Sequence, residues 1–171
     1  MSRNLKKSKS QLKLTPAQYN ALTDDVILVK GIGDTEAVAI VIANDKYKNF
    51  PPLTGAVRDG AVVAESLKKL GFRVLTSYNK SKSELLSELN DLKRQLDEKT
   101  GILVVYYAGY AVEIDSNGYI LAIDAPFPDS EQKVINDSIK VDEMIGLASK
   151  DKFATVLIFD ASRDNPFRGT R

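Results

Sequence analysis

A serine just beyond a buried apolar run is the first residue of this sequence that could do chemistry. The segment "VLIFDASRDNPF", residues 156–167, changes from an apolar strand to a polar, turn-forming stretch, and Ser162 takes the slot after the strand. A serine hydroxyl attacks an amide carbonyl only when a positioned base accepts its proton. The chain contains no histidine and no cysteine, so the commonest general base and a thiolate nucleophile are both excluded.

The composition predicts one globular domain. The chain has 171 residues, of which 43% are hydrophobic, and it carries 24 basic and 23 acidic side chains. No apolar run reaches the roughly 18 residues that a membrane-spanning helix requires, and the N-terminus lacks the pattern of a secretory signal. We therefore expect a cytoplasmic protein, and the absence of cysteine excludes disulfides and thiolate metal sites.

The N-terminal region differs in charge from the rest of the chain. Residues 1–14 hold five basic residues and no acidic ones, which predicts a flexible basic tail. Such tails are usually solvated, so contact with nucleic acid or a membrane through this tail is not favoured. Residues 15–36 are expected to form an N-terminal extension before the main domain.

Apolar runs and amphipathic stretches alternate beyond the extension. Short apolar runs predict strands at residues 37–43, 73–78, 102–108 and 154–160. Apolar residues at spacings of three and four predict helices at residues 56–72, which ends at Gly71, and 81–99, which begins with a Ser81–Glu84 capping box.

Two further elements are expected in the second half of the chain. The segment "DSNG", residues 115–118, predicts the turn of a hairpin between "AVEI" and "YILAI". Residues 137–149 suggest another helix, which starts near Asp137 or Ser138.

Alternating strands and helices predict an α/β fold. The sheet should be mostly parallel with helices on both faces, because a parallel connection needs a crossover that the helices supply. Ligands of such sheets bind beyond the carboxyl ends of the strands. Four residues fall at or just after those ends: Asp59, Tyr110, Asp160 and Ser162. They either converge on one cleft or are polar residues that any such fold places there.

Four blocks of the sequence resemble the caspase-like peptidases of family C14. They are "AVAIVIANDKYKNFPPLTGAVRDGAVVAESLKKLGF", "LVVYYAGY", "YILAIDA" and "VLIFDASRDNPF", and they follow the family's order over residues 37–168. The resemblance is closest to the large-subunit (p20-like) region of bacterial metacaspase-like proteins, the orthocaspases. It implies a three-layer caspase-like fold over residues 37–171, with the small-subunit region absent.

The resemblance also implies that both catalytic residues are replaced. In active members a histidine follows the glycine of the block that matches "YYAGY", and the cysteine is third in the block that matches "DASR"; these positions hold Tyr110 and Ser162. A phenol is almost fully protonated at neutral pH, so a tyrosine is a poor base for a serine. The resemblance therefore implies a pseudopeptidase that serves as a binding or regulatory module. The alternative is a residual hydrolase that uses Ser162 in place of the cysteine.

The residues for substrate binding are better retained than the catalytic pair. The resemblance places Asp59, Asp160 and Ala108 in a primary pocket for arginine or lysine side chains. Carboxylates pair favourably with a cationic side chain when the pair is partly desolvated and hydrogen-bonded. The alternative is structural: Asp160 caps backbone N–H groups at the strand end, and Asp59 is the N-terminal cap or lies in the first turn of its helix.

Neither a cofactor nor a metal is expected. The acidic cluster of calcium-dependent metacaspases is incomplete, since "AVEIDSNGYI" offers only Glu113 and Asp115. Without a small-subunit region the edge after the last strand would be exposed, and an open edge invites pairing with another chain. The expected partner is a peptide or protein, either an active caspase-like relative or the small-subunit region itself, and the open edge also allows an oligomer.

Overall fold

The structure is a computed structural model that describes residues 35–127, 130–146 and 153–162. The expected basic tail, most of the expected extension and residues 163–171 lie outside the described residues. The described part contains six strands and four helices. In chain order they are β1 (Glu36–Ala43), α2 (Ala56–Lys69), β2 (Arg73–Tyr78), α3 (Lys82–Gln95), β3 (Thr100–Ile114), β4 (Asn117–Ile120), α4 (Glu131–Asp137), β5 (Ile139–Lys140), α5 (Val141–Ile145) and β6 (Ala154–Ser162).

The strands form one mixed sheet with a parallel centre. β1 pairs in parallel with β2 and β3, and β3 pairs in parallel with β6. The last residues of β3 continue past β6 and pair antiparallel with β4, which pairs antiparallel with β5. The expected α/β fold with a mostly parallel sheet is confirmed, and the expected hairpin is a small antiparallel extension of that sheet.

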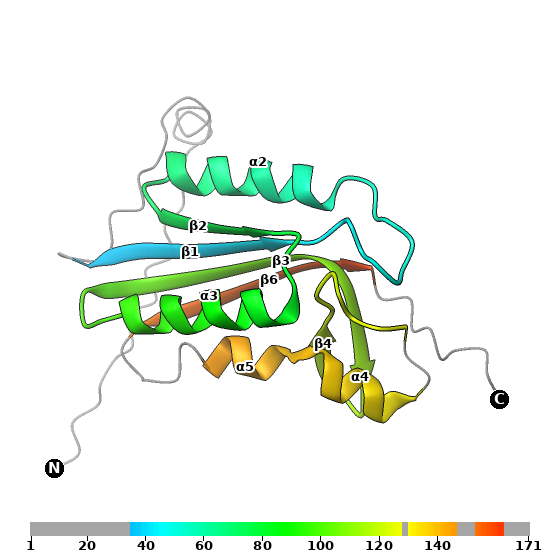
Figure 1. Cartoon of the computed structure of the whole chain (residues 1–171). Helices are drawn as coiled ribbons and strands as arrows, with labels where there is room; N and C mark the ends of the chain where they lie inside the picture. The colour runs from blue at the N-terminus through cyan, green and yellow to red at the C-terminus, as the bar shows by residue number, and fades with distance from the viewer. Residues whose placement is uncertain (1–34, 128–129, 147–152, 163–171) are drawn as a thin grey trace, which may run out of the picture.

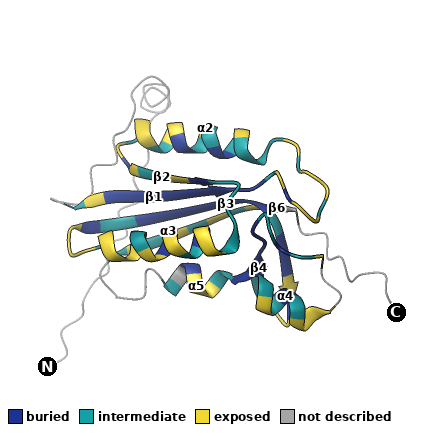
Figure 2. Ribbon diagram, in the orientation of Figure 1, coloured by how far each residue is buried: buried dark blue, intermediate teal, exposed yellow. Residues whose placement is uncertain are grey.

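Helices cover both faces of the sheet (Figure 1). α2 packs on one face, through Ala64, against Val41, Tyr106 and Ala108. α3 packs on the other face through Leu85, Leu89 and Leu92, which lie in one cluster with the apolar side chains of β1 and β3. Figure 2 shows the resulting layers, with buried central strands between helices whose outer faces are exposed. None of the described helices is long and apolar enough to cross a bilayer.

The helix boundaries follow the capping signals in the sequence. α3 starts after Ser81, whose side chain accepts the Glu84 N–H, while the Glu84 carboxylate accepts the Ser81 N–H at 2.9 Å. α2 ends before Gly71, which has a φ of 88° and so adopts the left-handed conformation that favours glycine. α3 is shorter than predicted and ends at Gln95, because β3 already begins at Thr100.

The helix expected over residues 137–149 is found only in part: α5 (Val141–Ile145) lies within that range, but the expected start near Asp137 or Ser138 is wrong. Instead, α4 ends at Asp137, where the helix was expected to begin, and residues 147–149 lie outside the described residues. Ser138 is extended, with φ −102° and ψ 177°, and the next residue, Ile139, is fully buried and pairs with Ile120 of β4. The burial of Ile139 in a strand thus interrupts a stretch whose local pattern suggests one helix.

The predicted hairpin is confirmed. Ile114 pairs with Asn117, so the loop consists of Asp115 and Ser116, with φ values of 49° and 61°. Two residues with positive φ make the primed type of turn whose twist matches the flanking strands. This tight loop directs β3 straight back into β4.

Candidate functional site

The residues at positions 110 and 162 lie side by side at the carboxyl ends of two neighbouring strands. In the parallel register of β3 and β6, Tyr110 is opposite Ser162 and Ala108 is opposite Asp160. Four of the five residues singled out in the sequence therefore share one edge of the sheet. Only the strand position of Ser162 is described, and its side chain is not.

The side chain of Tyr110 is held in a cluster of aromatic rings. Its ring centroid lies 4.9 Å from that of Tyr47 and 5.6 Å from that of Phe50. Its hydroxyl donates to the carbonyl oxygen of Pro51 at 3.3 Å. The phenol thus fixes the loop after β1 to the end of β3, and its proton is directed at a carbonyl.

The main chain around Tyr110 is held by two buried tyrosines. The Tyr110 N–H donates to the Tyr47 hydroxyl oxygen at 2.9 Å, and the Tyr110 carbonyl accepts from the Tyr107 hydroxyl at 2.6 Å. Both hydroxyls also lie 3.2–3.3 Å from the carbonyl oxygen of Leu121. A Cβ atom on Gly109 would lie 2.5 Å from the Tyr47 hydroxyl and 2.6 Å from that of Tyr107, so this close approach requires glycine.

Asp59, Ala108 and Asp160 line one open hollow of about 180 Å³, which we call the acidic hollow. Its remaining lining residues are Leu53, Thr54, Ala56 and Gly109. Asp59 comes from the first turn of α2, whereas Ala108 and Asp160 come from neighbouring strands. The structure therefore brings the three residues of the expected pocket together, next to positions 110 and 162.

Asp59 is available to a ligand despite an ion pair. Its carboxylate lies 3.2 Å from Nε of Arg58, and the two side chains are 48% and 77% exposed. Exposed pairs contribute only about 0–1 kcal/mol, so a cationic ligand can replace Arg58 at little cost. The N-terminal cap of α2 is Gly55, without a side-chain cap, so Asp59 occupies the first turn and not the cap. A carboxylate there is also stabilised by the helix dipole.

Asp160 is oriented by Tyr106, a residue that the sequence reasoning missed. The Tyr106 hydroxyl donates to Oδ2 of Asp160 at 3.3 Å. The pKa of Tyr106 is raised to about 12. Burial is the largest cause, followed by the negative charge of Asp160, the hydrogen bond to Asp160 and the negative charge of Asp59. Tyr106 lies two residues before Ala108, so the alternation of side chains along a strand could have placed it on the same face.

We expect the protein to lose stability at alkaline pH because of three tyrosines near the site, Tyr47, Tyr106 and Tyr107. Burial raises the pKa of Tyr47 and Tyr107, and that of Tyr106 reaches about 12. Because these folded-state values exceed the unfolded value of about 10, their contribution is fully present below about pH 10 and is lost as the pH rises through the folded values. Denaturant unfolding at about pH 8 and pH 11 should show this fall, and the loss should be smaller in Tyr106→Phe. An equal loss in Tyr106→Phe would contradict the assignment to Tyr106.

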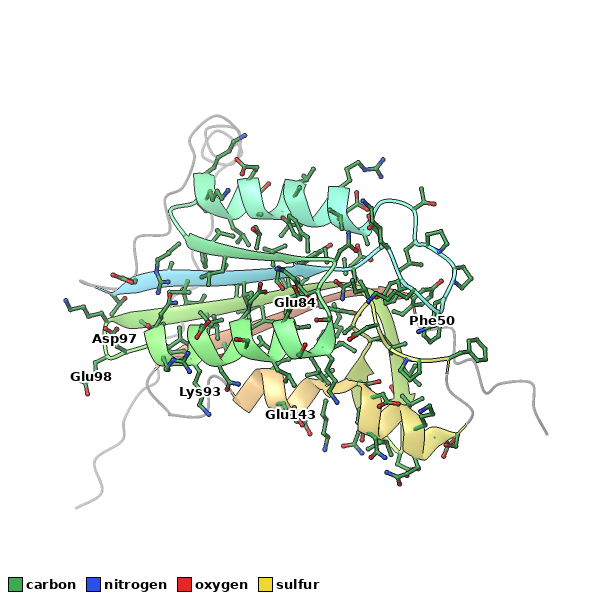
Figure 3. All side chains as sticks on the ribbon, viewed as in Figure 1. Phe50, Glu84, Lys93, Asp97, Glu98 and Glu143 are labelled. Atoms are coloured by element: carbon green, nitrogen blue, oxygen red, sulfur yellow. The ribbon has the colours of Figure 1, made fainter. Side chains whose placement is uncertain are left out.

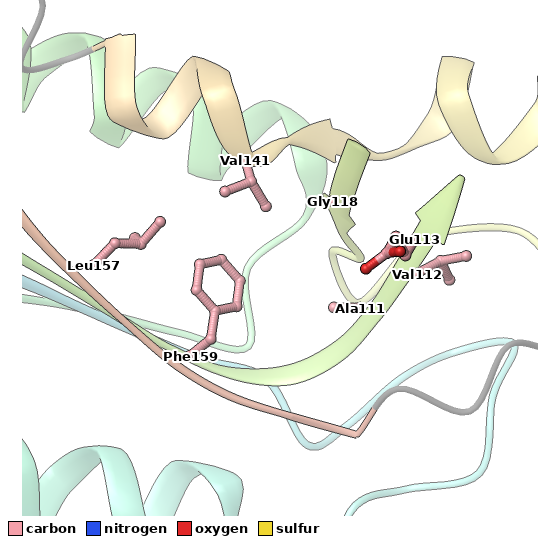
Figure 4. A pocket seen from close by; sticks show the side chains of 7 residues that line it. All are labelled: Ala111, Val112, Glu113, Gly118, Val141, Leu157 and Phe159. Atoms are coloured by element: carbon pink, nitrogen blue, oxygen red, sulfur yellow. The ribbon is translucent and has the colours of Figure 1, made fainter. Parts of the chain in front are cut away.

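A second hollow of about 180 Å³ lies on the opposite face of β6 (Figure 4). Leu157 and Phe159 line it, and they alternate along the strand with Ile158 and Asp160. Its other lining residues are Ala111, Val112, Glu113, Gly118 and Val141. It contains none of the expected site residues, and within the described ranges no group of three acidic side chains could hold a metal ion.

Comparison with known proteins agrees with the fold. The family model described as the caspase domain matches residues 36–171. The chain is also similar to the human mucosa-associated lymphoid tissue lymphoma translocation protein 1 and to its mouse homologue. Each is 29% identical over 94 residues, which are 54% of this chain and 11% of the relative. The chain therefore belongs to the caspase-domain family of peptidases, C14.

Proposed function

We propose that this caspase domain is a pseudopeptidase that binds an arginine or lysine side chain of a peptide or protein partner without cutting the chain. The observation that carries the proposal is the acidic hollow, in which Asp59 and Asp160 lie together beside positions 110 and 162. Within the family, we propose that the chain is most closely related to the bacterial orthocaspases. We also propose that the protein is located in the cytoplasm. Cell fractionation that found the protein outside the cytoplasm would contradict that location.

The absence of turnover follows from the residues at the two catalytic positions. A serine nucleophile needs a base, and no histidine is present anywhere in the chain. The Tyr110 hydroxyl donates to the carbonyl oxygen of Pro51, and its ring packs against those of Tyr47 and Phe50. Tyr110 therefore serves as a structural residue at the position where active members of the family place their base.

The retention of binding follows from the charges in the hollow. Hydrogen bonds to charged groups contribute about 1.5–3 kcal/mol, and because Asp59 and Asp160 are both exposed to solvent, each contributes less than this. Ala108, which lines the same hollow, presents only a methyl group and so takes up little of its space. A guanidinium or ammonium group on a flexible side chain suits this combination of open space and negative charge.

A peptide with one arginine should bind more tightly than the same peptide with citrulline, which has the same shape without the charge. Isothermal titration should give an affinity at least about tenfold higher for arginine, a difference of about 1.4 kcal/mol. The preference should weaken as salt is added, because the hollow is open to solvent. Equal affinities for the two peptides would contradict the proposed recognition of a cation.

The partner that we propose also covers β6. Val156 and Ile158 on this strand are each 42% exposed, and β3 is its pairing strand within the described residues. An open strand edge with apolar side chains favours pairing with another segment. We propose that a small-subunit region, a caspase-like relative or a second copy supplies that segment. Analytical ultracentrifugation over a series of concentrations tests this part. It would be contradicted if the chain sedimented as a monomer both by itself and in the presence of such partners.

A further inference from the structure

We propose that Phe50, Tyr110 and Phe127 form a second subsite, beside the acidic hollow, for an apolar or aromatic side chain next to the basic residue of the bound peptide. We call these three residues the aromatic ledge. The inference rests on the proposed function and specifies its ligand: a peptide segment in which arginine or lysine adjoins an apolar residue.

The three rings form a continuous row. The centroids of Phe50 and Tyr110 are 5.6 Å apart and those of Phe50 and Phe127 are 5.7 Å apart, with interplanar angles of 39° and 33°. Phe127 is 63% exposed, which is unusual for so large an apolar side chain. Figure 3 shows Phe50 on the loop after β1, at one end of the sheet. A row of rings with one exposed end offers a surface on which an apolar side chain can lose contact with water.

Hydrogen bonds hold the ledge in place. The Lys48 N–H donates to the carbonyl oxygen of Ile123 at 2.9 Å, and the Asn49 side-chain amide donates to that of Ala125 at 3.0 Å. These bonds join the loop that carries Phe50 to the segment that carries Phe127. Tyr47 supports the row from inside through edge-on contacts with Phe50 and Tyr110. The ledge is therefore ordered before a ligand arrives, which reduces the entropy lost on binding.

The ledge adjoins the acidic hollow through two residues. Leu53 packs against the same buried cluster as Phe50 and Tyr110, and it also lines the hollow. Gly109 lines the hollow and directly precedes Tyr110. Consecutive residues of an extended peptide are only about 3.8 Å apart. When a basic side chain enters the hollow, a neighbouring residue of the peptide consequently reaches the ledge.

The tyrosine that stands at the histidine position has a function in this arrangement. A tyrosine ring at position 110 adds apolar area where active members of the family, by resemblance, carry an imidazole. Aromatic side chains are enriched among the residues that dominate binding to peptides and proteins. Tyr110 thus contributes to recognition through its ring while its hydroxyl holds Pro51.

The test compares peptides of equal length that carry one arginine, flanked on either side by leucine, by phenylalanine or by glycine. The intact chain should bind the best apolar-flanked peptide about tenfold more tightly than the glycine-flanked one. Phe127→Ala should reduce this preference to about twofold or less, while Phe127→Leu should retain part of it. Because Phe127 is largely exposed, both variants should fold, which their thermal unfolding curves will show.

Val62→Ala is the matched control, since Val62 is 62% exposed on α2 and does not belong to the ledge. It should leave the preference for an apolar neighbour unchanged. If arginine is preferred over citrulline but glycine-flanked and apolar-flanked peptides bind equally, the ledge is wrong and the proposed function stands. If arginine and citrulline peptides bind equally, the proposed function is wrong, and so is the proposal that the acidic hollow and the aromatic ledge bind one peptide together. A preference that survives in Phe127→Ala also overturns the assignment.

Discussion

Gly109→Ala should lower the midpoint of thermal unfolding by about 3 to 10 °C, through about 1–3 kcal/mol of overpacking in a domain of this size. The added methyl group would lie 2.5 Å from the Tyr47 hydroxyl and 2.6 Å from the Tyr107 hydroxyl. Neither ring can move easily, because Tyr107 is fully buried and Tyr47 is 7% exposed. Circular dichroism during heating measures the shift.

Gly146→Ala provides the control for this change. Among the described residues, a Cβ atom at Gly146 would meet nothing within 4 Å, and the backbone there has the φ of −61° that alanine also prefers. This variant should unfold within about 1–2 °C of the unchanged chain. If Gly109→Ala were as stable as Gly146→Ala, the close contact of Gly109 with the two tyrosines would be wrong.

The double change Asp59→Asn and Asp160→Asn should weaken the binding of an arginine peptide by about 10- to 100-fold. This range corresponds to the loss of about 1.4–2.8 kcal/mol of charge-assisted hydrogen bonding. Asparagine keeps the size of each side chain, and its oxygen can still accept the Tyr106 hydroxyl. The single changes should each have a smaller effect, and their sum need not equal the double change because both carboxylates face one hollow. Titration calorimetry measures all three variants.

Asp115→Asn is the control for charge. It removes one negative charge from an exposed turn at which φ is 49°, a conformation that asparagine tolerates well. Asp115 is not among the residues that line the acidic hollow. Its replacement should change the affinity by less than about twofold at physiological salt, where distant charges are screened. A double variant that binds as tightly as Asp115→Asn would show that the hollow is not the binding site.

The parallel core of the fold could be predicted because its signals are local. The strand that became β1 is an uninterrupted apolar run, and Ser81 and Glu84 mark the start of α3 directly. The position of Tyr110 opposite Ser162 could also be anticipated, because the carboxyl ends of parallel strands meet at one edge. The convergence of Asp59, Ala108 and Asp160 on one hollow follows from the same rule together with the resemblance.

The parts that could not be predicted depend on contacts between distant segments. Phe127 reaches Phe50 because Asn49 binds the Ala125 carbonyl, and no local pattern in the sequence indicates that bond. The wrong start of the helix expected over residues 137–149 has a related cause, since Ile139 pairs with Ile120 of β4 and therefore lies in a strand. Local propensity is weak evidence when a tertiary contact of this kind competes with it.

The central claim is that the domain holds basic peptides without cutting them. Its most direct test is to incubate the chain and Ser162→Ala with a library of arginine- and lysine-containing peptides and to record the peptide masses over time. The account predicts that every peptide keeps its mass and that the two proteins give the same result. Cleavage after arginine or lysine by the unchanged chain that disappears in Ser162→Ala would contradict the account and establish Ser162 as a nucleophile.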